Sequence, residues 1–153
     1  MGSVLAAERR LVSLVQKAAD MPREEALLSV ARVLDEIAVA YHDIPDCPAD
    51  DREAEAAEQK FPDFGPIIAT AFPEFGQYWC ADQAVDISPD KRLLVGDARE
   101  DLNEILRELA GVRWRNEHLT AAAAAFYARL MQGHTLSHLL DLRRIVHLQL
   151  FGW

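Results

Sequence analysis

Four carboxylates have the spacing of a single helical stripe. Asp97, Asp101, Glu104 and Glu108 follow one another at intervals of four, three and four residues. At about 100° per residue, they fall within roughly a 60° sector of one helix. Like charges at these spacings repel each other by about 0.2–0.5 kcal/mol per pair, so the stripe would gain from a neighbouring positive charge.

Three interpretations of this acidic stripe remain open. We favour a solvent-facing surface near a helix N-terminus, where the helix dipole stabilises acidic side chains. The alternatives are pairing with arginines of a neighbouring helix and a site for a metal ion or a partner. Asp97, Asp101 and Glu104 are therefore candidate binding residues.

A second stripe, further along the chain, combines imidazoles with a carboxylate. His134, His138 and Asp141 follow the pattern H-x₃-H-x₂-D, which places them within roughly 60° of one another on a helix. Two imidazoles one turn apart can ligate one metal ion, and a carboxylate can complete the set. Asp141 could instead accept a hydrogen bond from His138 and fix its tautomer.

The surroundings of the histidine stripe favour a structural role. Ile145 and Leu148 share its sector, so we expect histidines that are paired within the core or an interface. A metal site and a pH-responsive or ligand contact are the alternatives. No metal and no other cofactor is assigned.

Templates for known catalytic chemistry are absent. The sequence contains no HExxH, GxSxG, Walker A or GxGxxG motif, each of which arranges a metal, a nucleophile or a phosphate. The sequence therefore favours a protein that is not an enzyme, and no catalytic residue is assigned.

The charge balance excludes a typical nucleic-acid-binding protein. The 153 residues include 16 basic and 25 acidic side chains, for a net charge of −9, whereas such proteins carry a basic stripe. Eight of the acids lie within residues 42–63, which we interpret as a solvated linker or, alternatively, as a patch for a basic partner.

No apolar stretch reaches the ~20 residues of a membrane span, and the N-terminus lacks the charge order of a secretory signal. We expect a cytoplasmic protein.

Helical periodicity predicts the elements that carry both stripes. Apolar residues recur at helical spacing over about residues 4–19, 22–43, 97–118 and 120–150. Asp97 is a suitable N-cap for the third helix. Gly133 predicts a bend or an interruption of the last helix, into 120–132 and 134–150. The predicted core positions are Leu34, Ile37, Leu102, Ile105, Leu109, Leu139, Leu142 and Val146.

The middle of the chain predicts an irregular Phe/Pro/Gly connector. An acidic linker is expected over about 45–60, with a short helix near 50–59, and the connector over about 61–94. The motif FPDFG at residue 61 recurs as FPEFG at residue 72. Its phenylalanines are predicted to anchor the chain to the core, and a ligand-gripping aromatic loop with Tyr78 and Trp79 is the alternative. A short helical segment is expected at 66–71 and an extended piece at 77–81.

These elements define the expected fold class. No segment shows convincing strand alternation, so residues 1–153 are predicted to form one all-α domain. We expect an antiparallel helical bundle with four main helices and additional short ones.

Residues of both stripes resemble an uncharacterised bacterial family of all-helical domains. The likeness rests on Val95, Gly96, Asp97, Asp101, Leu102, Glu104, Ile105, Arg107, Glu108 and Leu109, followed by His134, His138, Asp141, Arg144 and His147. These positions match a VGxxxDDLxDIYxDL-like helix and an HxxxHxxDxxRxxH terminal helix, over about residues 93–148. Thr135 replaces a family tryptophan. The resemblance implies an all-helical fold and implies no activity.

The function expected from these observations is a non-enzymatic interaction or regulatory module of the bacterial cytoplasm. The last helix is apolar around most of its circumference, which favours a homodimer, and a basic protein is the alternative partner. No nucleic acid and no membrane is expected as a partner. The other functions left open are a metal-binding bundle, enzyme or sensor, using His134, His138 and Asp141, and a bundle that binds a small ligand.

Overall fold

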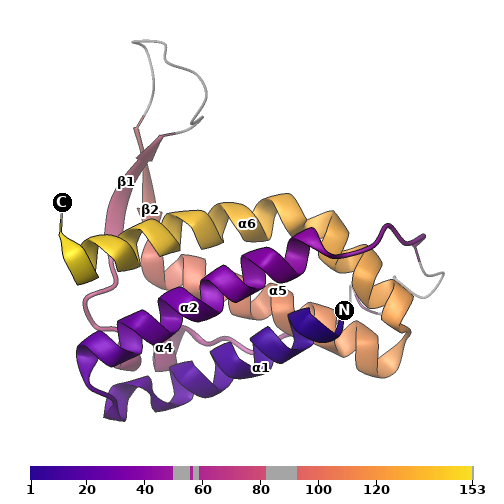
Figure 1. Cartoon of the computed structure of the whole chain (residues 1–153), viewed down its shortest axis with the longest axis horizontal. Coiled ribbons are helices and arrows are strands. Elements are labelled where there is room, and N and C mark those ends of the chain that lie inside the picture. The colour runs from indigo at the N-terminus through magenta and orange to yellow at the C-terminus, as the bar shows by residue number, and fades with distance from the viewer. Residues whose placement is uncertain (50–55, 57–58, 82–92, 153) are drawn as a thin grey trace.

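The computed structural model describes residues 1–49, 56, 59–81 and 93–152, and most of them are helical (Figure 1). The helices are α1 (Gly2–Lys17), the short η1 (Ala18–Asp20), α2 (Arg23–His42), α4 (Gly65–Ala71), α5 (Ala98–His118) and α6 (Ala121–Phe151). Two strands, β1 (Gln77–Ala81) and β2 (Leu93–Asp97), complete the fold. The predicted all-α class is confirmed, while the short helix expected near 50–59 falls largely outside the described residues.

The four long helices enclose one hydrophobic core. α1 and α2 form one antiparallel pair, and α5 packs extensively along α6 to form the other (Figure 1). All eight predicted core positions, from Leu34 to Val146, are at most 1% exposed. Each such side chain contributes about 1.5–3 kcal/mol through burial, so the apolar faces read from the sequence are the faces that pack. Among the described helices, none combines the length and the apolar character that crossing a bilayer requires.

Phenylalanines of the connector anchor it to the bundle, as predicted. Phe72 and Phe75 are fully buried, and their rings stack with centroids 4.8 Å apart. The guanidinium of Arg23, at the start of α2, lies 5.0 Å from the Phe72 ring centroid. Phe64 packs against the core, and its N–H donates to Oδ1 of Asn103 on α5 at 2.9 Å. The connector is therefore fixed to both helix pairs.

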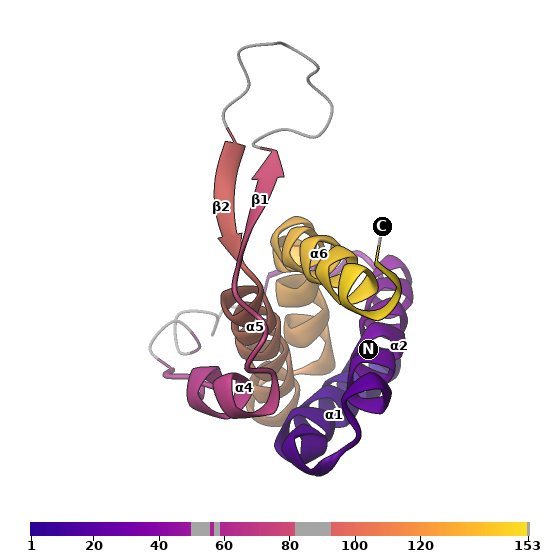
Figure 2. The same ribbon diagram turned by 90° about the vertical axis from the view of Figure 1, so that its left-hand side faces the viewer.

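The prediction of an irregular connector over 61–94 is wrong for Leu93 and Leu94, which begin β2, and its residues 82–92 lie outside the described residues. β1 coincides with the expected extended piece, but it pairs antiparallel with β2, with Gln77 opposite Asp97 and Ala81 opposite Leu93. Neither strand, QYWCA or LLVGD, alternates polar and apolar residues, so neither gives the sequence signal of a half-buried strand. The resulting hairpin projects from the bundle beside α5 and α6 (Figure 2). Asp97 ends β2 and caps α5 as predicted, because its Oδ1 accepts from the Arg99 N–H at 2.9 Å.

Of the bend or interruption predicted at Gly133, the interruption is wrong. α6 is one helix of 31 residues that continues through Gly133, and it curves along its length (Figure 1). A glycine in a helix interior costs only about 0.5–1 kcal/mol relative to alanine. The packing of α6 against α2 and α5 outweighs that cost.

We expect Gly133→Ala to stabilise the protein by about 0.5–1 kcal/mol in urea denaturation. A Cβ at this position would meet no atom within 4 Å, so only the backbone entropy of the unfolded chain changes. The matched control is Gly111→Ala in α5, where a Cβ would lie 3.0 Å from the Tyr127 ring. That variant is expected to destabilise, and stabilisation by both variants would contradict the packing described.

One carboxylate is buried on α1, away from the two stripes. Glu8 is 1% exposed, and neither of its oxygens has a hydrogen-bond partner among the described residues. Arg113 of α5 lies 3.5 Å away. Burial raises the pKa of Glu8 above its ordinary value, while the charge of Arg113 opposes the rise.

This buried carboxylate makes stability depend on pH. Between its unfolded pKa of about 4.3 and its higher folded pKa, the native state binds more protons than the unfolded state, so stability is lost as pH rises through that window. We therefore expect Glu8→Gln, which cannot ionise, to gain stability relative to the wild type as pH rises from 4 to 8, by on the order of 1 kcal/mol. Urea titrations from pH 4 to 8 should show that the unfolding free energy of Glu8→Gln minus that of the wild type grows with pH. A difference that stays constant with pH would contradict the raised pKa of Glu8.

Candidate functional site

The two stripes predicted separately face each other in the structure. α5 presents Asp101 and Glu108, which are each 5% exposed, toward α6. His138 donates from Nδ1 to Oδ1 of Asp101 at 2.7 Å, and His134 pairs through Nδ1 with Oε1 of Glu108. We call these residues, together with Thr135, the histidine–carboxylate cluster.

Glu108 uses its second oxygen inside the protein. The hydroxyl of Thr135 donates to Oε2 of Glu108 and also lies 3.5 Å from the hydroxyl of Tyr41 on α2. Thr135 is fully buried. Burial raises the pKa of Tyr41, so this phenol stays neutral. Both oxygens of Glu108 are thus held by donors from α6.

Asp101 is shared between α6 and the hairpin. Its Oδ1 accepts from His138, and its Oδ2 accepts from the hydroxyl of Tyr78 on β1 at 2.5 Å. The hydrogen bond to Asp101 raises the pKa of His138, and partial burial opposes the rise. Asp101 therefore fixes the ring orientation of His138 and leaves the other ring nitrogen directed away from α5.

The remaining ring nitrogens of the two histidines converge. Nε2 of His134 lies 3.2 Å from Nε2 of His138, with the rings nearly perpendicular at 82°. A neutral imidazole that donates from Nδ1 presents a lone pair at Nε2. Two such lone pairs repel at this distance, so the geometry favours a positive charge there, either a proton on one ring or a metal ion between the two. The side chain of His134 is 53% exposed, which leaves the pair open to solvent.

The solvent-facing interpretation of the acidic stripe is therefore wrong for Asp101 and Glu108. Their partners are histidines of α6 rather than arginines of a neighbouring helix, because α6 lies directly against this face of α5. Glu104 does remain partly exposed, where it pairs with Arg107 at 2.9 Å. Asp97 serves as the helix cap and stands outside the cluster.

Asp141 does not accept the hydrogen bond from His138 that the sequence left open. Its nearest ion-pair partner is Arg144, at 3.7 Å on the same helix. Partial burial raises the pKa of Asp141, with Arg144 opposing the rise. Asp101, from another helix, takes the place at Nδ1 of His138 because its carboxylate is buried against α6.

Tyr78 and Gly96 belong to the site, although the sequence did not connect either with the two stripes and offered Tyr78 only for an aromatic loop. They face each other across the hairpin, and a Cβ on Gly96 would lie 2.4 Å from Cζ of the Tyr78 ring. Only glycine allows the ring to cross β2 and reach Asp101. Gly96 belongs to the VG pair of the family resemblance, which was a signal, but nothing in the sequence pairs it with Tyr78.

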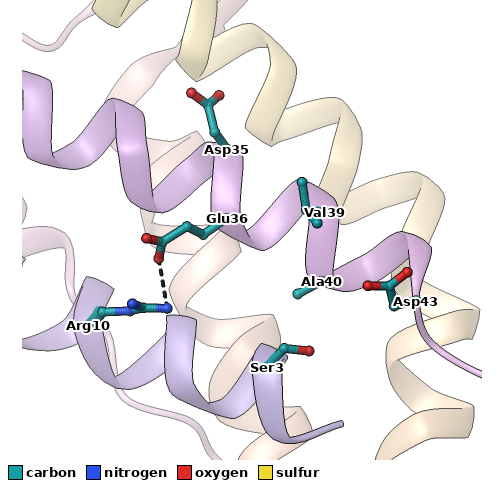
Figure 3. Close-up of a pocket in the computed structure, with 7 residues that line it drawn as sticks. All are labelled: Ser3, Arg10, Asp35, Glu36, Val39, Ala40 and Asp43. Atoms are coloured by element: carbon teal, nitrogen blue, oxygen red, sulfur yellow. Dashed lines mark ion pairs between the residues drawn. The ribbon is translucent and has the colours of Figure 1, made fainter.

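A separate groove lies between α1 and α2, and none of the residues that line it belongs to the histidine–carboxylate cluster (Figure 3). Its volume is about 400 Å³, and it is lined by Ser3, Arg10, Asp35, Glu36, Val39, Ala40 and Asp43. Arg10 pairs with Glu36 at 2.8 Å, and Asp35 is bound by Arg143 of α6 at 2.9 Å. Two of its three acids thus already have arginine partners.

The cluster offers two metal-ligating side chains rather than a complete set. Within the described part of the chain, no three His, Cys, Asp or Glu side chains gather closely enough to hold a metal ion. Asp141, the third member of the predicted set, is engaged with Arg144. Any metal bound by this geometry would complete its coordination with water.

The fold is similar to that of a solved protein. The crystal structure of protein BF1032 from Bacteroides fragilis matches with a TM-score of 0.71, over 99% of this chain and 92% of that chain, at 12% sequence identity. This likeness shows a shared fold alone. No family model matches the sequence, and no curated protein does either. The resemblance to the uncharacterised helical family stays a prediction.

The close approach of Tyr78 to Gly96 can be tested with a double-mutant cycle. We expect Gly96→Ala to destabilise the wild type by about 1–3 kcal/mol, because the new methyl group displaces the ring. In a Tyr78→Ala background, where no ring is present, the same change should cost less than about 0.5 kcal/mol. Equal costs in the two backgrounds, measured by urea denaturation, would contradict the contact.

Proposed function

We propose that this protein is a non-enzymatic, metal-binding regulatory module that holds a divalent transition-metal ion between Nε2 of His134 and Nε2 of His138. The observation that carries the proposal is the convergence of these two nitrogens while both Nδ1 atoms are bound to buried carboxylates. In protein metal sites, ligating histidines almost always donate their other ring N–H to a carboxylate, a carbonyl or water.

The distance between the two nitrogens supports this proposal. Ligands at the usual Zn–N distance of about 2.0–2.1 Å, in tetrahedral geometry, lie roughly 3.3 Å apart. The nitrogens of His134 and His138 are 3.2 Å apart. Little movement of either ring would be needed to bind the ion.

The local charge also supports a cation. Asp101 and Glu108 each bond one of the imidazoles, and the charges of Glu104 and Asp141 also act on His138. Two arginines accompany them, since Arg107 pairs with Glu104 and Arg144 with Asp141. With neutral imidazoles, four negative and two positive charges leave −2, which a divalent ion would balance. Imidazole nitrogen suits Zn²⁺, Cu²⁺ and Ni²⁺ rather than Ca²⁺ or Mg²⁺.

Calorimetry of Zn²⁺ binding tests the proposal. The protein carries no tag, and it is first stripped of metal with a chelator that is then removed. We expect one site with a Kd of about 1–100 µM, since two protein ligands act without a third. His138→Ala should weaken binding at least about tenfold. His147→Ala removes an exposed histidine of the same helix outside the cluster, and it should leave the affinity unchanged.

A purely structural role for the histidines predicts a different result. His138→Ala would destabilise the metal-free protein by about 1–3 kcal/mol, because Asp101 loses its buried partner. In that case the wild type would bind no Zn²⁺ in this range, and Zn²⁺ would not raise its melting temperature. That pair of results would overturn the metal-binding proposal.

The expected homodimer stays a prediction beside this proposal. α6 carries three exposed large apolar side chains, Leu130, Leu140 and Phe151, each about two-thirds exposed. They lie ten and eleven residues apart, about 15 Å along the helix, so by themselves they do not form one contiguous apolar patch. A partner on α6 would lie on the helix that also carries the proposed metal ligands.

A further inference from the structure

The hairpin and the histidine–carboxylate cluster share one carboxylate. Asp101 accepts from His138 of α6 at one oxygen and from Tyr78 of β1 at the other. The hydroxyl of Tyr78 donates to Asp101 directly, at 2.5 Å. A movement of Tyr78 therefore changes the hydrogen bonding of the group that orients His138.

A second tie joins the same two elements. Arg144 of α6 donates to the carbonyl oxygen of Trp79 at 3.2 Å, and its guanidinium lies 5.7 Å from the centroid of the Tyr78 ring. Arg144 also pairs with Asp141. The hairpin thus contacts α6 through the Trp79 carbonyl and the Tyr78 ring, while the Tyr78 hydroxyl reaches Asp101 of α5.

The base of the hairpin is joined to α5. The N–H of Ala98, the first residue of α5, donates to the carbonyl of Gly76 at 3.1 Å. Gly96 leaves room for the Tyr78 ring to cross β2. The side chain of Trp79, by contrast, is 66% exposed, so the hairpin has one face on the cluster and one face in solvent.

We propose that Tyr78 is a positioning residue for the metal site, so that metal occupancy and the hairpin β1–β2 are energetically linked. This inference rests on the proposed function. Tyr78 touches neither ligating nitrogen and acts through Asp101, which orients His138. Linkage is reciprocal, so a metal ion that fixes His138 stabilises the hairpin, and a partner that fixes the hairpin raises metal affinity by the same factor.

The first measurement is the Zn²⁺ affinity of Tyr78→Phe. This variant keeps the ring over Gly96 and removes only the hydroxyl that Asp101 accepts from. Changing residues that support a metal ligand typically costs 10–100-fold in affinity, and Tyr78 is one bond further removed, so we expect Zn²⁺ binding about 3–10-fold weaker. Trp79→Ala, which alters the exposed face of the same strand, is the control and should bind as the wild type does.

The second measurement is amide hydrogen exchange of the hairpin with and without Zn²⁺. In the wild type, the amides of Tyr78 and Gly96, which form a hydrogen-bonded pair of the ladder, should exchange at least about threefold more slowly when Zn²⁺ is bound, because the linked element opens less often. In Tyr78→Phe this slowing should be lost. A role of Tyr78 in stability alone would not make hairpin exchange respond to metal.

The outcomes separate this inference from the proposed function. If the wild type binds no Zn²⁺, both are overturned. If the wild type binds Zn²⁺ through His138 but Tyr78→Phe binds it equally well, or if hairpin exchange is the same with and without Zn²⁺, the inference alone is overturned. Weaker binding by Tyr78→Phe together with a metal-dependent slowing in the wild type supports it.

Discussion

The burial of Asp101 and Glu108 between α5 and α6 constrains the rest of the structure. A carboxylate removed from water costs several kcal/mol unless hydrogen-bond donors surround it. Each of these two carboxylates has both oxygens occupied, and α6 provides at least one donor to each. The register between α5 and α6 is thereby fixed, since sliding either helix would separate both carboxylates from their donors on α6.

The spacing of the four paired residues explains why the two imidazoles converge. Asp101 and Glu108 are separated by two turns of α5, about 10.5 Å, whereas His134 and His138 are separated by one turn of α6, about 6 Å. The rings therefore spread toward the acids at Nδ1 and approach each other at Nε2. The convergence of the two Nε2 atoms follows from this mismatch, and the antiparallel order of the helices sets which acid meets which histidine.

The hairpin shows how a short, weak element can belong to a site. Two strands of five residues are marginal alone, and here they are held by the Tyr78 hydroxyl on Asp101 and by Arg144 on the Trp79 carbonyl. Gly96, opposite Tyr78, does not have a positive φ angle that would require glycine at this position. Its role is to leave space for the ring, which is a requirement of tertiary contact and not of local conformation.

The sequence alone determined the helices, their apolar faces and the two stripes that meet at the site. These features follow from spacing along one chain segment, because the helical period places residues such as Leu102 and Ile105, or His134 and His138, on common faces. It did not determine which acid would pair with which histidine, nor that Tyr78 would reach Asp101. Those contacts join residues 23–37 positions apart, so they depend on how α5, α6 and the hairpin pack, and that packing was decided by the whole core.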